Sequence, residues 1–322
     1  RKLKGSKYCK FCGNTSGIDI DKLAEVIGVS KDEISKSNPG EEKYQYVTRG
    51  LAFNYNSVNG ISIIECVGRI NGNKIESLPN ELWKQKELEV LNISANKIKS
   101  IPNGLGKLKN LNMIDFGHNQ ISKIPASIGK LKNLESFVYL HNNLLTKLPS
   151  EITHLHKIKY LNISQNKIKN LPQQIGSLKK MIEFKAEDNK LSKLPPSFIK
   201  LSSLIELNLS NNNIKSLPIG FKKLKKLRVL NLENNRINQL PVDNTELREL
   251  YVRNNAIAEI PKSVAKLKKL RKLDLRGNQI IELPKELLGL ENIERLDLRW
   301  NSKLIIPNWL SQLQNKGCII YY

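Results

Sequence analysis

The sequence predicts an α/β repeat solenoid in which each repeat contributes one short strand and one short helix or 3-10 turn. The first observation is a 23-residue period: segments 98–125 and 214–241 both read I-x-x-[IL]-P-x-x-[LF]-x-x-L-x-x-L-x-x-[IL]-x-[FL]-x-x-N-x-I. The second is an asparagine that recurs in one register, at Asn73, Asn96, Asn119, Asn142, Asn166, Asn189, Asn212, Asn235, Asn255, Asn278 and Asn301. Self-similarity at such a period is the signature of a repeat architecture, in which the leucines of one repeat are buried against the next.

Each part of the repeat has a physical reason. In "LNLSNN" the alternating Leu207 and Leu209 predict a short strand with one buried face. The chain then turns at Asn212, whose side chain can bond backbone groups of the turn and of the neighbouring repeat. We therefore expect the recurring asparagines, from Asn96 to Asn301, to form a ladder of satisfied buried amides. Loss of one side chain should cost about 1–3 kcal/mol.

The remaining part of the repeat returns the chain on the outside. The residue before a proline avoids the helical region, so the "LP" step sets the crossover. The following segment, with Ile128 and Leu131 in one copy, predicts a short helix or 3-10 turn.

The pattern LPxxIxxLxxLxxLxLxxNxI, over roughly residues 61–307, resembles the leucine-rich-repeat family. It is most similar to the Ras-group repeats of plants and animals and to bacterial proteins with the same repeat type. The resemblance implies a curved solenoid with a parallel sheet on its concave face and short helices or 3-10 turns on its convex face. It also implies a surface that binds another protein, and no catalysis.

Two repeats are irregular. "YLHNNLLTKLP" contains one extra residue, which predicts a local bulge after Asn142. The step from Asn235 to Asn255 is three residues short, because "LPVDNTELREL" lacks most of the outer segment. We expect that repeat to be thin on its convex side.

The sequence predicts three parts: an N-terminal cap or mainly helical segment at 1–58, a solenoid of about eleven repeats at 59–307, and a C-terminal cap at 308–322. Segment 18–40 resembles the helix–turn–helix portion of a LysM module and also that of DNA-binding proteins, while a plain cap is a third interpretation. Cys9 and Cys12 form a CxxCG motif without a second pair, which leaves half a zinc site, a disulfide or free thiols open. We predict no cofactor and no metal site.

Alternation along the strands places the side chains six, four and two residues before each asparagine on the concave face. In the early repeats these are Val90, Asn92, Ser94, Met113, Asp115, Gly117, Ser136, Val138 and Leu140. The middle repeats are acidic there or at the adjoining edge, with Glu183, Glu187, Asp188, Glu206 and Glu233 against Lys185. The last three repeats carry Arg253, Lys272, Arg276, Arg295 and Arg299 against Glu249, Asp274 and Asp297.

Arg253, Arg276 and Arg299 form a column where sister repeats carry Ser94, Ser164 and Ser210. Arg, Tyr and Trp are enriched at binding hot spots. The predicted partner-binding residues are Tyr251, Arg253, Lys272, Arg276, Arg295, Arg299, Trp300, Glu187, Glu206 and Glu233. The alternative is a self-neutralised lattice with Asp274 and Asp297, which we expect to satisfy the arginines only in part.

The function predicted is a protein-interaction module without enzymatic activity, because no nucleophile–base pair, phosphate-binding loop or pair of catalytic acids occurs in the sequence. One alternative is a glycan- or envelope-associated protein that uses residues 1–58. Another follows from the net charge of +23, since lysines of the outer segments could bind nucleic acid or an anionic membrane. His118 and His141 suggest either a metal pair or pH switch, or solvent-facing side chains.

Overall fold

The structure is a computed structural model that describes residues 54–58, 61–65, 67–69, 74–78 and 80–322. The predictions for residues 1–53, including Cys9, Cys12 and the LysM-like segment, and the position of Asn73 lie outside these residues. The chain divides after Ile158 into two compact units, each of which is described by itself.

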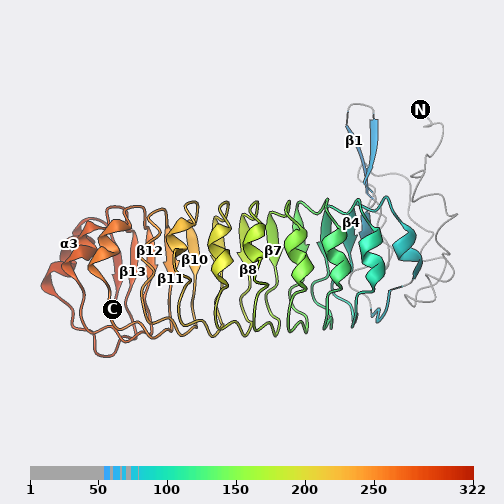
Figure 1. Cartoon of the computed structure of the whole chain (residues 1–322). Helices are drawn as coiled ribbons and strands as arrows, with labels where there is room; N and C mark the ends of the chain where they lie inside the picture. Colours follow the sequence, from blue (N-terminus) through green and yellow to red (C-terminus); the bar gives the residue numbers. More distant parts are fainter. Residues whose placement is uncertain (1–53, 59–60, 66, 70–73, 79) are drawn as a thin grey trace. The chain divides into compact units, whose positions relative to one another are not determined.

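The described part of the first unit contains an antiparallel pair of strands followed by a parallel sheet (Figure 1). The antiparallel strands are β1 (Asn54–Val58) and β2 (Ile61–Glu65), which pair across the boundary predicted at residues 58 and 59. The parallel strands, in spatial and chain order, are β3 (Val67–Arg69), β4 (Val90–Asn92), β5 (Met113–Asp115) and β6 (Phe137–Tyr139). The 3-10 helices are η1 (Asn80–Lys84), η2 (Asn103–Lys107), η3 (Ala126–Lys130) and η4 (Ser150–His154).

The second unit repeats the same arrangement in a purely parallel sheet whose spatial order follows the chain (Figure 1). Its strands are β7 (Tyr160–Asn162), β8 (Glu183–Lys185), β9 (Glu206–Asn208), β10 (Val229–Asn231), β11 (Glu249–Tyr251), β12 (Lys272–Asp274), β13 (Arg295–Asp297) and β14 (Ile319–Tyr321). The helices are η5 (Ile175–Ser177), η6 (Pro196–Lys200), η7 (Phe221–Lys223), η8 (Lys262–Lys266), η9 (Lys285–Gly289), η10 (Asn308–Leu310) and the α-helix α3 (Ser311–Asn315). The predicted repeat solenoid is therefore confirmed.

The core lies between the strands and the outer turns. From β4 to β13 the middle residue of each strand is buried, as are the apolar residue two positions later and the apolar residues of the outer turn; Leu207, Leu209 and Leu204 illustrate this at 0% exposure. A proline precedes most outer turns and accepts the first short-range bond, as in Leu105 N–H to the carbonyl of Pro102 at 3.1 Å. Because each repeat supplies only one such layer, its apolar side chains are covered by those of the neighbouring repeats.

The recurring asparagines lie in the turns after the strands, where each side chain makes several hydrogen bonds to the backbone. Asn212 donates from Nδ2 to the carbonyls of Ala186, Leu209 and Ser210 at 2.9–3.0 Å, and its Oδ1 accepts the N–H of Leu191 at 2.9 Å. Donation to the carbonyls of the residue's own turn recurs at Asn96, Asn119, Asn166, Asn189, Asn235, Asn255, Asn278 and Asn301. The amide thus joins its own turn to the backbone of the preceding repeat.

The assignment of Asn142 to this ladder is wrong. The ladder position is taken by Asn143, which is buried and donates to Phe116 O at 2.9 Å while accepting the N–H of Ile121 at 2.9 Å. Asn142 is exposed, has φ of 49° and contacts His118. The extra residue therefore lies before the strand rather than after Asn142.

This shift reverses the faces of β6. Val138 and Leu140, which were predicted on the exposed side, are fully buried. Phe137, Tyr139 and His141 are half-buried on the opposite side instead, with ring centroids of neighbouring members 5.3 and 5.9 Å apart. Successive side chains of a strand alternate between faces, so a displacement by one residue exchanges them.

The shortened repeat between β10 and β11 has no 3-10 helix in this part of the described chain. A buried asparagine replaces part of the missing turn: Asn244 Nδ2 donates to the carbonyls of Phe221 and Leu224 at 3.3 and 3.2 Å. The predicted thinning on the outer side is therefore present, and a polar side chain compensates for some of the lost backbone bonds.

The final segment closes the second unit. Leu310 of η10, Leu313 of α3 and Cys318 are buried. β14 adds one more strand beside β13. No helix within the described residues has the length and apolar composition that crossing a bilayer requires.

Candidate functional site

The exposed side of the strands in the second unit is here called the strand face. Its side chains alternate with buried ones, because strands such as β9, β10 and β11 each have a buried residue between two half-buried ones. The predicted residues Tyr251, Arg253, Lys272, Arg276, Arg295, Arg299, Glu187, Glu206 and Glu233 all lie on this face or at its edge, on β8 to β13 or in the turns that follow them. Trp300 follows β13 in the next turn.

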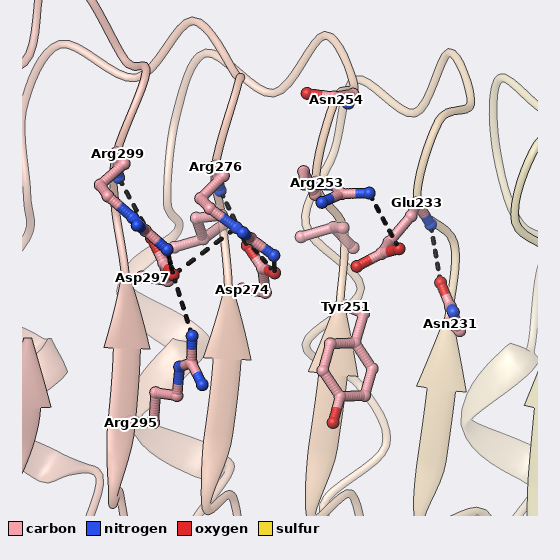
Figure 2. Close-up of polar contacts among 12 residues, drawn as sticks. Asn231, Glu233, Tyr251, Arg253, Asn254, Asp274, Arg276, Arg295, Asp297 and Arg299 are labelled. Carbon is pink, nitrogen blue, oxygen red and sulfur yellow. Dashed lines mark hydrogen bonds and ion pairs between the residues drawn. The ribbon is translucent and has the colours of Figure 1, made fainter. Parts of the chain in front are cut away.

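Arg276 is largely satisfied by aspartates. Its Nε lies 2.9 and 3.0 Å from the two carboxylate oxygens of Asp274, and its Nη2 contacts the same carboxylate. The Oδ2 atom of Asp297, on the adjacent strand β13, lies 3.5 Å from Arg276 Nε (Figure 2). The Arg276 side chain is only 17% exposed, so it is more completely paired than the sequence suggests.

Asp274, Arg276, Arg295, Asp297 and Arg299 form a connected group of ion pairs, here called the charge lattice, and Asp297 is its centre. Its side chain is 2% exposed and receives Arg299 Nη2 at 2.7 Å and Arg295 Nη2 at 3.4 Å, in addition to Arg276 (Figure 2). Burial disfavours the carboxylate, but the hydrogen bond from Arg299 and the two nearby guanidinium charges outweigh it, so the pKa of Asp297 lies below its usual range. Arg295 and Arg299 remain 48% and 37% exposed.

The third arginine of the column is paired differently. Arg253 Nη2 lies 3.7 Å from Glu233 on the preceding repeat. Burial raises the pKa of Glu233, and the charge of Arg253 opposes that rise. Tyr251 points its hydroxyl away from Arg253 (Figure 2) and donates to Glu249 at 2.6 Å.

Glu249 also accepts a hydrogen bond from Lys272 at 2.9 Å. Four of the predicted binding residues, Tyr251, Arg253, Lys272 and Arg276, are thus held by acidic groups of the chain itself. These contacts satisfy Arg276 most completely, whereas Arg253 keeps a buried Nε without a hydrogen bond.

The acidic part of the strand face has fewer basic groups to neutralise its carboxylates. Lys185 pairs with Glu183 at 2.7 Å, and Glu206 lies opposite Glu183 in the register of β8 and β9. Burial first, and then the charge of Glu183, raise the pKa of Glu206. This region is a cluster of like charges, and Glu187 adds a carboxylate oxygen that is buried without a hydrogen bond.

A row of left-handed residues runs along the edge of the strand face. One residue with positive φ precedes each ladder asparagine, for example Asn211, Asn234 and Asn254 at 53–54°. Their amides connect in series, with Asn211 donating to Asp188, Asn234 to Asn211, and Asn254 to Asn234 at 2.6–2.7 Å. Asn, Asp and Gly adopt this conformation readily, so the row explains the polar residues at this position.

Trp300 is the bulkiest residue in this row, which also contains Ala95 and Gln165. It has φ of 63° and is 65% exposed, although bulky residues with positive φ are rare and strained. The guanidinium carbons of Arg276 and Arg299 lie 5.8 and 5.9 Å from its ring centroid. An exposed tryptophan held in this conformation is a feature that the repeat scaffold does not require.

The strain at Trp300 can be measured with two variants that both remove the ring. We expect Trp300→Gly to be more stable than Trp300→Ala by about 1 kcal/mol, because only glycine adopts positive φ without cost. At an ordinary position in α3, such as the exposed Gln312, the order should reverse by a similar amount. Urea unfolding of the four variants checks this, and equal stabilities at position 300 would contradict the strain.

Sequence reasoning missed one member of the site. Tyr321 of β14 is exposed, and the guanidinium carbons of Arg295 and Arg299 lie 4.9 Å from its ring. Together, Arg295, Arg299, Trp300 and Tyr321 are here called the C-terminal cluster. They are the side chains of the basic end that combine exposure with aromatic and guanidinium surface.

The outer lysines have a role within the chain. Lys109, Lys132 and Lys268 place Nζ 3.1–3.4 Å from the carbonyls of Lys130, His154 and Gly289, near the ends of the next 3-10 helices. Cations favour the carbonyl ends of helical turns. This placement supports a structural role for these lysines.

The chain is similar to leucine-rich-repeat proteins. A family model described as "Leucine rich repeat" matches residues 69–121, 86–138 and 245–302, and one described as "Leucine-rich repeat region" matches residues 146–234. The matched segments together cover more than half of the chain. No significant match occurs among curated proteins.

Solved structures give the same result. A leucine-rich-repeat protein of Leptospira interrogans is 25% identical, with a TM-score of 0.59 over 79% of this chain and 83% of that one. The plant peptide hormone receptor RGFR1, solved in complex with RGF2, is 29% identical with a TM-score of 0.64, over 71% of this chain and 39% of the receptor. An internalin from Listeria monocytogenes shares the fold at 23% identity and a TM-score of 0.62, over 70% and 65% of the two chains.

Proposed function

Because the chain belongs to the leucine-rich-repeat family, we propose that it is a protein-interaction module that binds a protein partner through the strand face of its second unit. The C-terminal cluster provides the contact surface. The observation that carries this proposal is Trp300, an exposed and strained tryptophan between arginines at the edge of the face. Trp, Tyr and Arg are the residue types that dominate binding energy at protein interfaces.

The charge lattice defines which predicted residues contribute. Arg276 is 17% exposed and paired with Asp274, and the buried Asp297 orients the exposed Arg295 and Arg299 through its carboxylate. A fixed guanidinium loses less side-chain freedom on binding than a free one. Arg253 and Lys272 then lie at the margin of the contact, and the acidic cluster at Glu187 and Glu206 favours a partner that carries basic groups at that end.

The comparisons support the class of function. RGFR1, which is 29% identical, is a peptide hormone receptor solved in complex with RGF2. Binding proceeds without catalysis in this proposal, and no cofactor is part of it.

The test requires a partner that crosslinks to the chain, identified by mass spectrometry, and a measured affinity. We expect Trp300→Asn to weaken binding by at least about tenfold, because loss of a hot-spot side chain costs about 2 kcal/mol or more. Asparagine occupies this position in three earlier repeats of the second unit, at Asn211, Asn234 and Asn254, so the turn is retained. Arg295→Ala should weaken binding in the same direction.

Two matched controls lie away from the cluster. Ile219 is 99% exposed near η7, and Arg236 is exposed after β10. Ile219→Asn and Arg236→Ala should leave the affinity unchanged. A partner that binds the Trp300→Asn and Arg295→Ala variants as tightly as the wild type would contradict this site.

A further inference from the structure

The outer edge of β14 is an exposed backbone edge in the described chain. β14 pairs with β13 on one side only and forms the end of the parallel sheet. Ile319 N–H donates to Glu294 O, and Tyr321 O accepts the N–H of Leu298. Backbone groups of successive strand residues point to opposite sides, so the N–H and C=O of Ile320 point away from β13.

Apart from its length of three residues, this edge lacks the features that usually prevent strands from pairing. Natural edges carry lysine, proline, a bulge or a covering loop, whereas β14 reads Ile319, Ile320, Tyr321. Ile319 is 59% exposed, and Tyr321 and the following Tyr322 are exposed as well. An uncovered edge with β-branched and aromatic side chains is a template for another strand.

We infer that β14 pairs antiparallel with β14 of a second copy of this chain, about a two-fold axis through Ile320. In this register Ile320 of each copy exchanges both backbone hydrogen bonds with its counterpart, as in a hydrogen-bonded antiparallel pair. Ile319 then lies opposite Tyr321 of the other copy on the strand face. Aromatic and β-branched residues are a favourable cross-strand pair, so the three-residue strand is complementary to itself.

A second copy fits this edge better than an unrelated strand, because every favourable contact occurs twice about the two-fold axis. A closed two-fold contact is the commonest symmetry of protein oligomers. The arginines beside Tyr321 do not prevent it, since Asp297 offsets part of their charge. The contact is small compared with a standard interface, so we expect a dissociation constant on the order of 10–100 μM.

The dimer should strengthen with salt. Each copy carries a formal charge of +23, and salt screens the repulsion between two such copies. The backbone hydrogen bonds and apolar contacts of the pair are not weakened by the added salt. An association carried by ion pairs of the charge lattice would show the opposite dependence.

Sedimentation equilibrium of the whole chain over a range of concentrations tests the pairing. Ile320→Pro removes the outward N–H but no bond to β13, and edge strands accept proline at such a position. We expect it to weaken dimerisation by at least about tenfold, with Arg299 and Trp300 unchanged. Ile319→Lys is a second variant, which places a positive charge opposite Tyr321 of the other copy and beside Arg295, and it should act in the same direction.

The matched control is Ile305→Lys, because Ile305 is 63% exposed but lies outside β14. It should dimerise like the wild type, and circular dichroism should show that all three variants keep their fold. A chain that stays monomeric at all concentrations, or dimerises equally well as Ile320→Pro and Ile319→Lys, would overturn the inference. Partner binding is measured separately, so a monomeric chain would leave the proposed function standing.

The register can be tested by crosslinking. The Cα atoms of an antiparallel hydrogen-bonded pair lie about 5.5 Å apart, within reach of a disulfide. Ile320→Cys, made with Cys9, Cys12 and Cys66 replaced by serine, should give a covalent dimer under mild oxidant, linked between the two introduced cysteines. The native Cys318 is buried, and burial raises the pKa of its thiol to about 11, which keeps it unreactive. A link through any other pair of residues would exclude this register.

Discussion

Replacement of Asp297 by alanine should destabilise the second unit by about 3 kcal/mol, the lower end of the cost of breaking a buried ion pair. The carboxylate is 2% exposed and receives three guanidinium groups. Its removal leaves Arg276 with Asp274 alone and frees Arg295 and Arg299, which must turn toward water. Urea unfolding followed by the fluorescence of Trp300 and Trp309, which lie near the lattice in the chain, measures the change.

The control for this prediction is an exposed ion pair in the same repeat. Arg271 and Glu294 form a contact of 2.7 Å with both side chains about half exposed, and such surface pairs contribute roughly 0–1 kcal/mol. Glu294→Ala should therefore change the stability little. If Asp297→Ala and Glu294→Ala have equal effects, the lattice does not stabilise the unit.

Asp297 also predicts a pH dependence with a definite sign. Its folded-state pKa is lowered, so its contribution is fully present above the unfolded-state pKa of about 3.9 and is lost as the pH falls through the lower folded-state value. The stability difference between the wild type and Asp297→Ala should therefore be constant near neutral pH and shrink below about pH 4. A difference that persists unchanged into strong acid would show that the charge is not its cause.

Asn143→Ala should destabilise the first unit by about 2–3 kcal/mol, because buried carbonyls and the N–H of Ile121 lose their partner. The adjacent Asn142 is the matched control, since the sequence pattern assigns the ladder to it and the structure does not. Asn142→Gly keeps the left-handed turn and removes only an exposed contact with His118. We expect a change of less than about 0.5 kcal/mol for this variant.

Thermal and urea unfolding of the two variants decide the register directly. A larger loss for Asn142→Gly than for Asn143→Ala would restore the sequence-based assignment and return Val138 and Leu140 to the exposed side. The aromatic group formed by Phe137, Tyr139 and His141 would then also disappear.

The fold was predictable because its period is encoded redundantly. The recurring asparagine, the "LP" step and the alternating leucines each indicate the same 23-residue repeat. The register of one repeat was not recovered, since "HNN" offers two candidates for a single position. The flanking prolines do not resolve it, because Pro125 precedes Asn142 by 17 residues as Pro102 precedes Asn119, whereas Asn143 precedes Pro149 by 6 as Asn119 precedes Pro125. The buried hydrogen bonds of Asn143 decide it and place the insertion before the strand.

The positions of the site residues were predictable from the sequence, but the extent to which acidic groups of the chain pair with them was not. Alternation places Arg253, Arg276 and Arg299 on the strand face, where the structure finds them. How far each arginine is satisfied depends on rotamers and on aspartates of the neighbouring strand, such as Asp297 for Arg276. Tyr321 was missed because the terminal segment follows no repeat template, although its position opposite Asp297 in β14 results from simple strand pairing.

The direction of the asparagine hydrogen bonds has a consequence for how the number of repeats can change in evolution. Asn212 binds Ala186 and Leu191, which belong to the preceding repeat, and Asn255 binds Leu232 and Ile237 in the same way across the shortened repeat. Each repeat thus supplies the asparagine side chain that binds the backbone of the repeat before it. Unequal recombination that duplicates or deletes one whole repeat recreates the same junction at both ends, so the number of repeats can change without any new kind of contact.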